Sequence, residues 1–172
     1  FIGPESDIPA PDMYTDEQVM AWMMDTYSMM KGYAVPGVVT GKPVCIGGSL
    51  GRNKATSAGL VTTVMEALKY LGIAPQGLSV TVLGFGKVGY HAAKILFDMG
   101  IKVIGAADSK GALYNPQGLD IDAVFGHKTK HGALRGYDGA QELSIDELIS
   151  IESDILIPAA FEGQIHGGNV RT

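Results

Sequence analysis

The strongest local pattern in the sequence spans residues 79–94, which read Ser79-Val-Thr-Val-Leu-Gly84-Phe-Gly86-Lys-Val-Gly89-Tyr-His-Ala-Ala-Lys94. It opens as a short apolar, β-branched run, breaks at three glycines and continues with a helical pattern. Glycines at this spacing are a weak signal alone, but a strand before them and a helix after them are the context of a dinucleotide-binding turn. The stretch therefore predicts a strand, a tight turn and a helix that bind the diphosphate of a dinucleotide.

Each of the three glycines has its own physical reason in such a turn. Gly84 permits the sharp turn off the strand, Gly86 has no Cβ to block a close pyrophosphate, and Gly89 lets the helix pack closely against the strand. The free N–H groups at the start of the helix face the phosphates. The cofactor-binding residues expected in this turn are Gly84, Phe85, Gly86, Lys87, Val88 and Gly89.

A second apolar run ends at Asp108, roughly 20 residues beyond the glycines. A carboxylate at the end of that second strand can accept both hydroxyls of an adenosine ribose. It would repel a 2′-phosphate, so the sequence favours NAD, while Ser109 and Lys110 leave NADP open. The alternative is a helix–sheet packing turn without a ligand, which the strand, helix and late aspartate taken together disfavour.

The composition is that of a globular protein. Its 172 residues are 46% hydrophobic and 18% charged, which suits one domain, or one domain with a piece of another. A net charge of −5 offers no basic surface for nucleic acid or an anionic membrane, and no apolar run approaches the roughly 20 residues that span a bilayer. We therefore expect neither a nucleic-acid partner nor a membrane. The first residue, Phe1, is not Met, which predicts a fragment.

Cysteine and histidine usage predicts neither disulfides nor a metal site. The single cysteine, Cys45, is typical of a reducing compartment, so we expect a cytoplasmic protein in which Cys45 is a small buried apolar side chain. His127 and His131 are four residues apart, but no acidic residue stands between them as a zincin motif requires. These histidines are expected to be polar, solvated side chains.

Helices and strands alternate along the rest of the chain. Thr15 and Gln18 predict a capping box for a helix that ends at Gly32, and its methionines are expected to pack in a core. Further helices are expected from Arg52 to Leu71, from Leu119 and from Ser144, and strands over residues 79–83, 102–107 and 154–158. The alternation predicts an α/β fold, a Rossmann-like domain with a mostly parallel sheet flanked by helices.

Two further groups of residues have the chemistry of a catalytic site. Asp12 ends the proline-stiffened loop Pro9-Ala-Pro-Asp12, which would hold a carboxylate in place for proton transfer. The alternative is a turn or cap residue. Arg52 and Thr56 share one face of a helix and could hold an amide and a carboxylate. The alternative is that neither residue binds a ligand: Arg52 would then be a solvated charge, and the Thr56 hydroxyl would face the core.

Ordered motifs run through the chain: Gly3-Pro-x-x-Asp7-Ile-Pro-Ala-Pro-Asp12-Met-x-Thr15, Met20-x-Trp22-x-x-Asp25-x-Tyr27, Val39-Thr-Gly-Lys-Pro43, Gly47-Gly-Ser-x-Gly-Arg52-x-x-Ala-Thr56, Gly84-Phe-Gly-x-Val-Gly89, Asp108-Ser-Lys-Gly111, Tyr114-Asn-Pro116 and Ile157-Pro-Ala-Ala160. In these motifs the sequence resembles the glutamate dehydrogenases of the Glu/Leu/Phe/Val dehydrogenase family over nearly its whole length. The first and fourth motifs favour the glutamate branch over the leucine and phenylalanine branches.

The resemblance implies reversible oxidative deamination of L-glutamate to 2-oxoglutarate and ammonia with NAD or NADP, in a homohexamer. It implies that Asp12 is the catalytic aspartate. It also places Arg52 and Thr56 near the nicotinamide carboxamide, and it places Ala159 and Ala160 along the cofactor cleft.

The resemblance further divides the chain. Residues 1–51 would be the hinge helix and active-site loop segment of the substrate domain, and residues 52–172 the dinucleotide-binding domain, incomplete at its C-terminal end. The family's catalytic lysines lie upstream of the proline loop, so this chain alone is expected to bind dinucleotide without turning over glutamate. Two alternatives stay open. One is a catalytically inactive nucleotide-binding or assembly module, motivated by departures from the family pattern at Ser57, Lys87 and Gly163. The other is a dehydrogenase for another amino acid.

Overall fold

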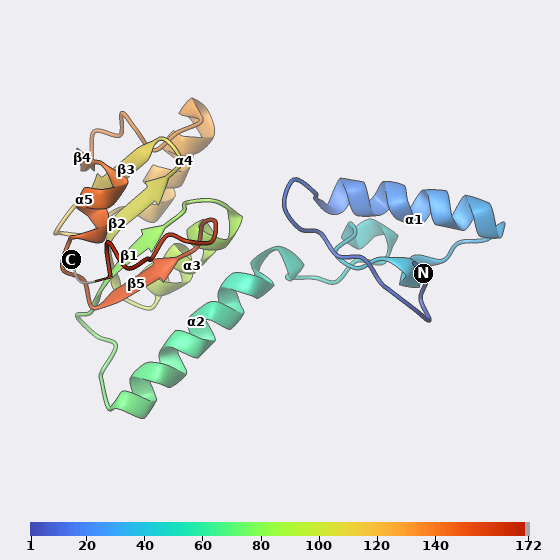
Figure 1. Ribbon diagram of the computed structural model, residues 1–172, viewed down its shortest axis with the longest axis horizontal. Helices are drawn as coiled ribbons and strands as arrows, with labels where there is room; N and C mark the ends of the chain where they lie inside the picture. The colour runs from blue at the N-terminus through green and yellow to red at the C-terminus, as the bar shows by residue number, and fades with distance from the viewer. Residues whose placement is uncertain (171–172) are drawn as a thin grey trace. The chain divides into compact units, whose positions relative to one another are not determined.

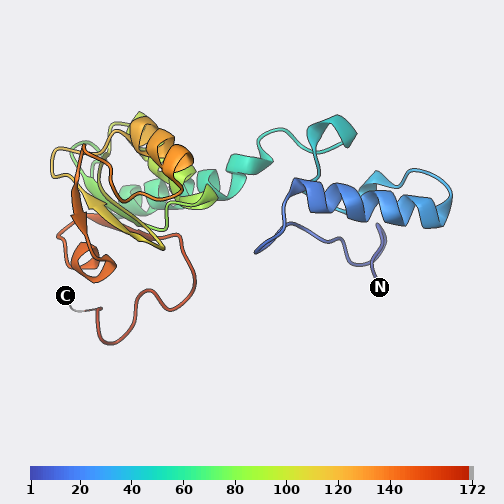
Figure 2. The same ribbon diagram turned by 90° about the horizontal axis from the view of Figure 1, so that it is seen from above.

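The structure is a computed structural model that describes residues 1–170 (Figures 1 and 2). The chain divides into two units, Phe1–Arg52 and Asn53–Thr172. The helices of the first unit are α1 (Glu17–Lys31) and the short 3-10 helices η1 (Pro36–Val38) and η2 (Val44–Ile46).

Helix α1 is capped by a carboxylate rather than by the predicted hydroxyl. The Asp16 side chain accepts two backbone N–H bonds of 3.0 Å from the first turn. The predicted cap at Thr15 is wrong because that hydroxyl accepts from the Asp12 N–H at 2.7 Å and donates to the Asp12 carbonyl at 3.0 Å. Asp16 carries a charge that the positive helix end also attracts. The predicted end at Gly32, in the left-handed conformation with φ 78°, is confirmed.

The methionines of α1 divide between the core and the surface of the first unit. Met20 is 2% exposed and packs against Val38 and Val39, as predicted. Met30 is 82% exposed, so the prediction of core packing is wrong for this residue. The prediction of a buried Cys45 is also wrong: the thiol is exposed, because it lies on η2, which has no buried residue.

The second unit has a five-stranded sheet between helices (Figure 1). Its elements are α2 (Arg52–Leu71), β1 (Ser79–Leu83), α3 (Lys87–Asp98), β2 (Lys102–Asp108), β3 (Gly111–Tyr114), α4 (Ile121–His131), β4 (Gln141–Leu143), α5 (Ile145–Ile149) and β5 (Ile155–Pro158). Within residues 1–170, none of the helices combines the length and the apolar stretch that crossing a membrane requires.

The strand order in the sheet is β4-β3-β2-β1-β5. Strand β1 pairs in parallel with β2 and β5, β3 runs antiparallel to β2, and β4 runs antiparallel to β3. All strands except β3 therefore run in one direction, and the predicted α/β, Rossmann-like fold with a mostly parallel sheet flanked by helices is confirmed. Strand β4 was not predicted because three residues are too few for a periodic pattern.

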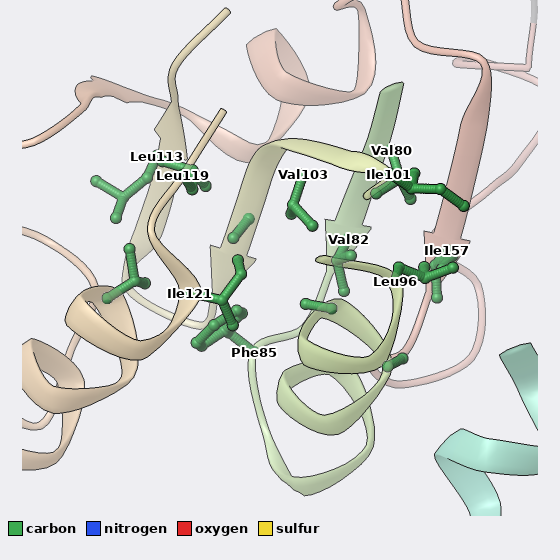
Figure 3. Packing of buried hydrophobic residues seen from close by; sticks show 14 of the residues in the cluster. Val80, Val82, Phe85, Leu96, Ile101, Val103, Leu113, Leu119, Ile121 and Ile157 are labelled. Atoms are coloured by element: carbon green, nitrogen blue, oxygen red, sulfur yellow. The ribbon is translucent and has the colours of Figure 1, made fainter. Parts of the chain in front are cut away.

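Strand β1, an interior strand of the sheet, is covered on both faces. Val80 and Val82 belong to the larger core cluster together with Leu96 of α3 (Figure 3). Leu83, which points to the other face, packs in a smaller cluster with Leu148 of α5. A strand buried on both faces reads as a continuous apolar run, which is why the sequence identified β1 so clearly.

Thr81, in the middle of β1, carries a hydroxyl that the fold does not use. The side chain is fully buried, and its oxygen has no hydrogen-bond partner within residues 1–170. Since an unsatisfied buried hydroxyl costs about 1–3 kcal/mol, Thr81→Val should raise the free energy of unfolding by about 1 kcal/mol. Urea denaturation measures the change. The control Thr63→Val, on the exposed face of α2, should change it by less than about 0.5 kcal/mol. A lower denaturation midpoint for Thr81→Val would contradict the prediction.

Candidate functional site

The carboxyl ends of β1, β2 and β5 meet at one edge of the sheet. The Gly84 N–H donates to the Ala107 carbonyl at 2.9 Å, and the Ala159 N–H donates to the Leu83 carbonyl at 2.7 Å. From β1 the chain crosses through α3 to β2 on one side, and it reaches β5, on the other side of β1, only later through α5. Open α/β sheets bind ligands at such a point, where the strand order changes direction. The structure thus brings the glycine turn, Asp108–Ser109 and Ala159–Ala160 to one edge.

Two of the three glycines are required by the packing of the protein itself. Gly84 has φ 100°, and a Cβ built on it would lie 2.5 Å from the Ala159 carbonyl oxygen. Gly89 is buried where α3 crosses β1, and a Cβ there would overlap the Gly84 carbonyl oxygen and lie 3.2 Å from a Val82 methyl. These two positions therefore say nothing about a ligand.

Gly86 is different, because nothing within the described part of the chain requires a glycine there. Its φ of −84° suits any residue, it is exposed, and no described residue lies within 4 Å of a Cβ built on it. The missing Cβ leaves open space at the start of α3, beside backbone N–H groups. The turn therefore fits a group from outside the chain that approaches the backbone closely, as a pyrophosphate does.

The start of α3 is electrostatically suited to an anion. Gly86 is its N-cap residue, and no side chain caps the first-turn N–H groups. Lys87 is exposed in this turn. The pKa of His91, one turn along the helix, is lowered by burial and then by the charges of Lys54 and Lys87, so two ammonium groups act on this end of α3. The lowered pKa favours the neutral form of His91, and the lysines supply the positive potential.

Asp108 ends β2, as predicted, but its carboxylate is already extensively bonded. Oδ1 accepts from the Lys110 N–H at 2.9 Å, and Oδ2 accepts from the Leu134 N–H at 3.0 Å. The Lys128 ammonium lies 3.3 Å from Oδ2, and the Asp108 side chain is only 7% exposed. A carboxylate has about four acceptor positions, so these two hydrogen bonds leave about two, one of them beside the Lys128 ammonium. Accepting both ribose hydroxyls would bring a hydroxyl close to that ammonium.

Lys128 is a residue of this edge that the sequence did not single out. It lies on α4, and its ammonium donates to the Phe85 carbonyl in the glycine turn at 2.8 Å while it pairs with Asp108. The polar segment 126–139 contains no sequence motif that would mark Lys128 as more important than the other polar residues around it. Only a tertiary contact identifies it.

Near its start, helix α2 buries the hydroxyl group of Ser57 rather than that of Thr56. Thr56 is exposed, so the alternative of a core-facing hydroxyl is wrong for it. Ser57 is buried instead, and its hydroxyl donates to the Val88 carbonyl at 2.9 Å, which joins α2 to the first turn of α3. Arg52 is exposed at the end of the first unit. A contact of Arg52 or Thr56 with the carboxamide stays a prediction.

Asp12 lies in the first unit, in a local turn. Its Oδ1 accepts from the Met13 N–H at 2.8 Å, and its backbone is bonded to the Thr15 hydroxyl. The side chain is exposed, so a carboxylate oxygen is available to solvent and to a substrate. Its catalytic role stays a prediction.

The paired histidines of α4 lie together. The rings of His127 and His131 stack with their centroids 4.5 Å apart, and His127 Nε2 lies 3.0 Å from the Arg135 carbonyl oxygen. Over residues 1–170, no three His, Cys, Asp or Glu side chains gather as a metal site would need.

Comparison with known families covers both units. Residues 47–172 match the family described as Glutamate/Leucine/Phenylalanine/Valine dehydrogenase, and residues 1–29 match the Glu/Leu/Phe/Val dehydrogenase dimerisation domain. The chain belongs to the Glu/Leu/Phe/Val dehydrogenase family. The resemblance predicted from the ordered motifs is therefore confirmed, and membership of a dehydrogenase family suggests a nicotinamide cofactor.

Two family members illustrate the similarity in sequence. The glutamate dehydrogenase of Thermotoga maritima is 47% identical over 98% of this chain and 41% of its own length. The NAD-specific glutamate dehydrogenase of Staphylococcus aureus strain COL is 42% identical over the same shares. This chain thus spans about two fifths of the length of these relatives.

Solved structures in the Glu/Leu/Phe/Val dehydrogenase family share the fold. The hetero-hexameric glutamate dehydrogenase of Thermus thermophilus, in its Leu-bound form, superposes with a TM-score of 0.93 at 42% identity, over 99% of this chain and 40% of that one. The Peptoniphilus asaccharolyticus enzyme superposes with a TM-score of 0.75 at 34% identity, over 99% of this chain and 39% of that one. The α/β fold described above is therefore a family fold.

Proposed function

We propose that the protein catalyses NAD-dependent oxidative deamination of L-glutamate to 2-oxoglutarate and ammonia, and that residues 52–172 hold the dinucleotide. Gly86 carries the proposal, because the open space beside it adjoins the uncapped N–H groups at the start of α3. Family membership and relatives named glutamate dehydrogenase support the reaction. The departures at Ser57 and Lys87 do not favour an inactive module, since Ser57 bonds α2 to α3 and Lys87 adds positive charge at the phosphate end.

The proposed roles follow from where the residues lie. The turn of residues 84–89 and the start of α3 would bind the pyrophosphate, and a remaining acceptor position of Asp108 would bind a ribose hydroxyl. When bound, the nicotinamide ring accepts a hydride from the substrate α-carbon. Asp12 would exchange protons with the amino group and with water, and residues 1–51 would belong to the substrate domain.

The preference for NAD rests on charge at the end of β2. A 2′-phosphate would meet the Asp108 carboxylate, while the Lys110 ammonium is already bonded to the Gly132 carbonyl at 3.1 Å. The Staphylococcus aureus relatives are named NAD-specific. We further propose a homohexamer. The hetero-hexameric Thermus relative supports six subunits, although its own subunits are not all alike, and the dimerisation domain matched at residues 1–29 supports self-association.

Gly86→Ala tests the dinucleotide site. It should weaken NADH binding by the 172-residue chain about tenfold or more, because the new methyl group occupies the space of the pyrophosphate. The fold should persist, with a loss of stability below about 1 kcal/mol, since only the N-cap preference changes. Isothermal titration calorimetry and a thermal melt measure the two effects.

A matched control is Gly126→Ala, on α4, where a Cβ also has open space among the described residues. It should leave NADH affinity unchanged. If Gly86→Ala bound NADH as tightly as the wild-type chain, the observation that carries the proposal would have no functional meaning.

A further inference from the structure

Helix α4 holds the glycine turn at two places. The Phe85 ring is buried and meets Tyr90 edge-on at 5.9 Å, and Tyr90 stacks on Phe125 of α4 at 3.7 Å. Phe85 belongs to the same core cluster as Ile121 of α4 (Figure 3). One turn beyond Phe125, the Lys128 ammonium donates to the Phe85 carbonyl at 2.8 Å. The side chain and the backbone of Phe85 are therefore both held from α4.

The bond to the Phe85 carbonyl sets the direction of the next N–H group. The chain contains no cis peptide bond within its described part, and in a trans peptide the C=O and the following N–H point in opposite directions. A carbonyl held toward Lys128 therefore aims the Gly86 N–H away from α4. This N–H adjoins the open space that the missing Cβ of Gly86 leaves.

The Lys128 ammonium is itself held in place. Its side chain is 25% exposed, and the ammonium lies 3.3 Å from Asp108 Oδ2 while it bonds to the turn. Asp108 is in turn held by the N–H groups of Lys110 and Leu134. The charge of Lys128 is therefore matched by a fixed carboxylate, while one of its N–H groups is bonded to the glycine turn.

We infer that Lys128 is a positioning residue, which holds the glycine turn in the conformation that presents the Gly86 N–H to the pyrophosphate. This inference rests on the proposed dinucleotide site. It assigns to Lys128 the orientation of the turn through Phe85 and Asp108 rather than a contact with the ligand.

Ligand titrations of the 172-residue chain test the inference. Lys128→Met should weaken ADP-ribose binding about tenfold, because the Phe85 peptide is no longer held, and should weaken binding of adenosine, which can meet Asp108 but has no pyrophosphate, by less than about threefold. Lys128→Arg should restore ADP-ribose affinity to within about threefold, since a guanidinium can donate to both the carbonyl and the carboxylate. The control Lys130→Met changes an exposed lysine of the same helix and should have no effect.

Lys128→Met also leaves the Asp108 carboxylate unpaired, which could destabilise the chain. A double variant therefore distinguishes the loss of the bond to the Phe85 carbonyl from the loss of charge balance. In the Asp108→Asn background no charge is left unpaired, and Lys128→Met should still weaken ADP-ribose binding by about threefold or more. Equal affinities with and without Lys128 in that background would overturn the inference.

Amide hydrogen exchange, measured without any ligand, tests the role of Lys128 independently of the proposed function. Amides of residues 84–89 should exchange roughly tenfold faster in Lys128→Met than in wild type, with unchanged exchange in β2. Equal exchange of the turn would overturn the positioning role. A wild-type chain that binds neither NADH nor ADP-ribose would overturn the proposed function instead, and the exchange result would still decide whether Lys128 holds the turn.

Discussion

Gly89→Ala is expected to destabilise the second unit strongly. The Cβ of an alanine there would overlap the Gly84 carbonyl oxygen and lie 3.2 Å from a methyl group of Val82. Neither the Gly84 carbonyl nor strand β1 can move away from the new methyl group without separating α3 from β1. The substitution should therefore cost more than about 3 kcal/mol. For a protein with a total stability of about 5–15 kcal/mol, that is a large share.

A thermal melt of the 172-residue chain, followed by circular dichroism, measures this effect. The midpoint should fall by about 10 °C or more. The control is Gly59→Ala in the exposed face of α2, where a Cβ has open space among the described residues and alanine favours the helix by up to about 1 kcal/mol. A Gly89→Ala chain with the wild-type midpoint would mean that α3 does not approach β1 as described.

Asp12→Asn is expected to abolish most of the glutamate-dependent NADH formation of the protein that carries this chain. Asparagine keeps an oxygen that can accept the 2.8 Å bond from the Met13 N–H, so the turn should persist. It cannot exchange protons as a carboxylate does, and a positioned acid–base group contributes about 10²–10⁴ to the rate. The value of kcat/KM should therefore fall by that order.

Steady-state rates measured from absorbance of NADH, together with NADH titration, separate this effect from binding. NADH affinity should remain unchanged, since the described contacts of Asp12 are local ones with Met13 and Thr15. Glu17→Gln, an exposed acid in the first turn of α1, is the control and should keep full activity. A wild-type value of kcat/KM for Asp12→Asn would show that Asp12 has no catalytic role.

Local patterns predicted the elements of this chain where a period or a cap was long enough to read. Helix α2, the strand and turn at residues 79–89, and β2 agree with the predictions. Two of the errors concern a choice between neighbouring residues. Thr15 and Asp16 are both good caps, and Thr56 and Ser57 are both small hydroxyl residues. The choice between Thr56 and Ser57 depends on the Val88 carbonyl, 31 residues further along the chain, whereas the Thr15 hydroxyl is already bonded to the nearby Asp12 carbonyl.

The family, the α/β class and the glycine turn could all be predicted from the amino-acid sequence, because strand and helix periods and glycine spacings are properties of short stretches. The tertiary structure added the close distances that require Gly84 and Gly89 in the packing, whereas Gly86 has open space beside it. It alone joined Lys128 to Phe85 and Asp108. Such contacts join residues far apart in the chain, and no local spacing encodes them.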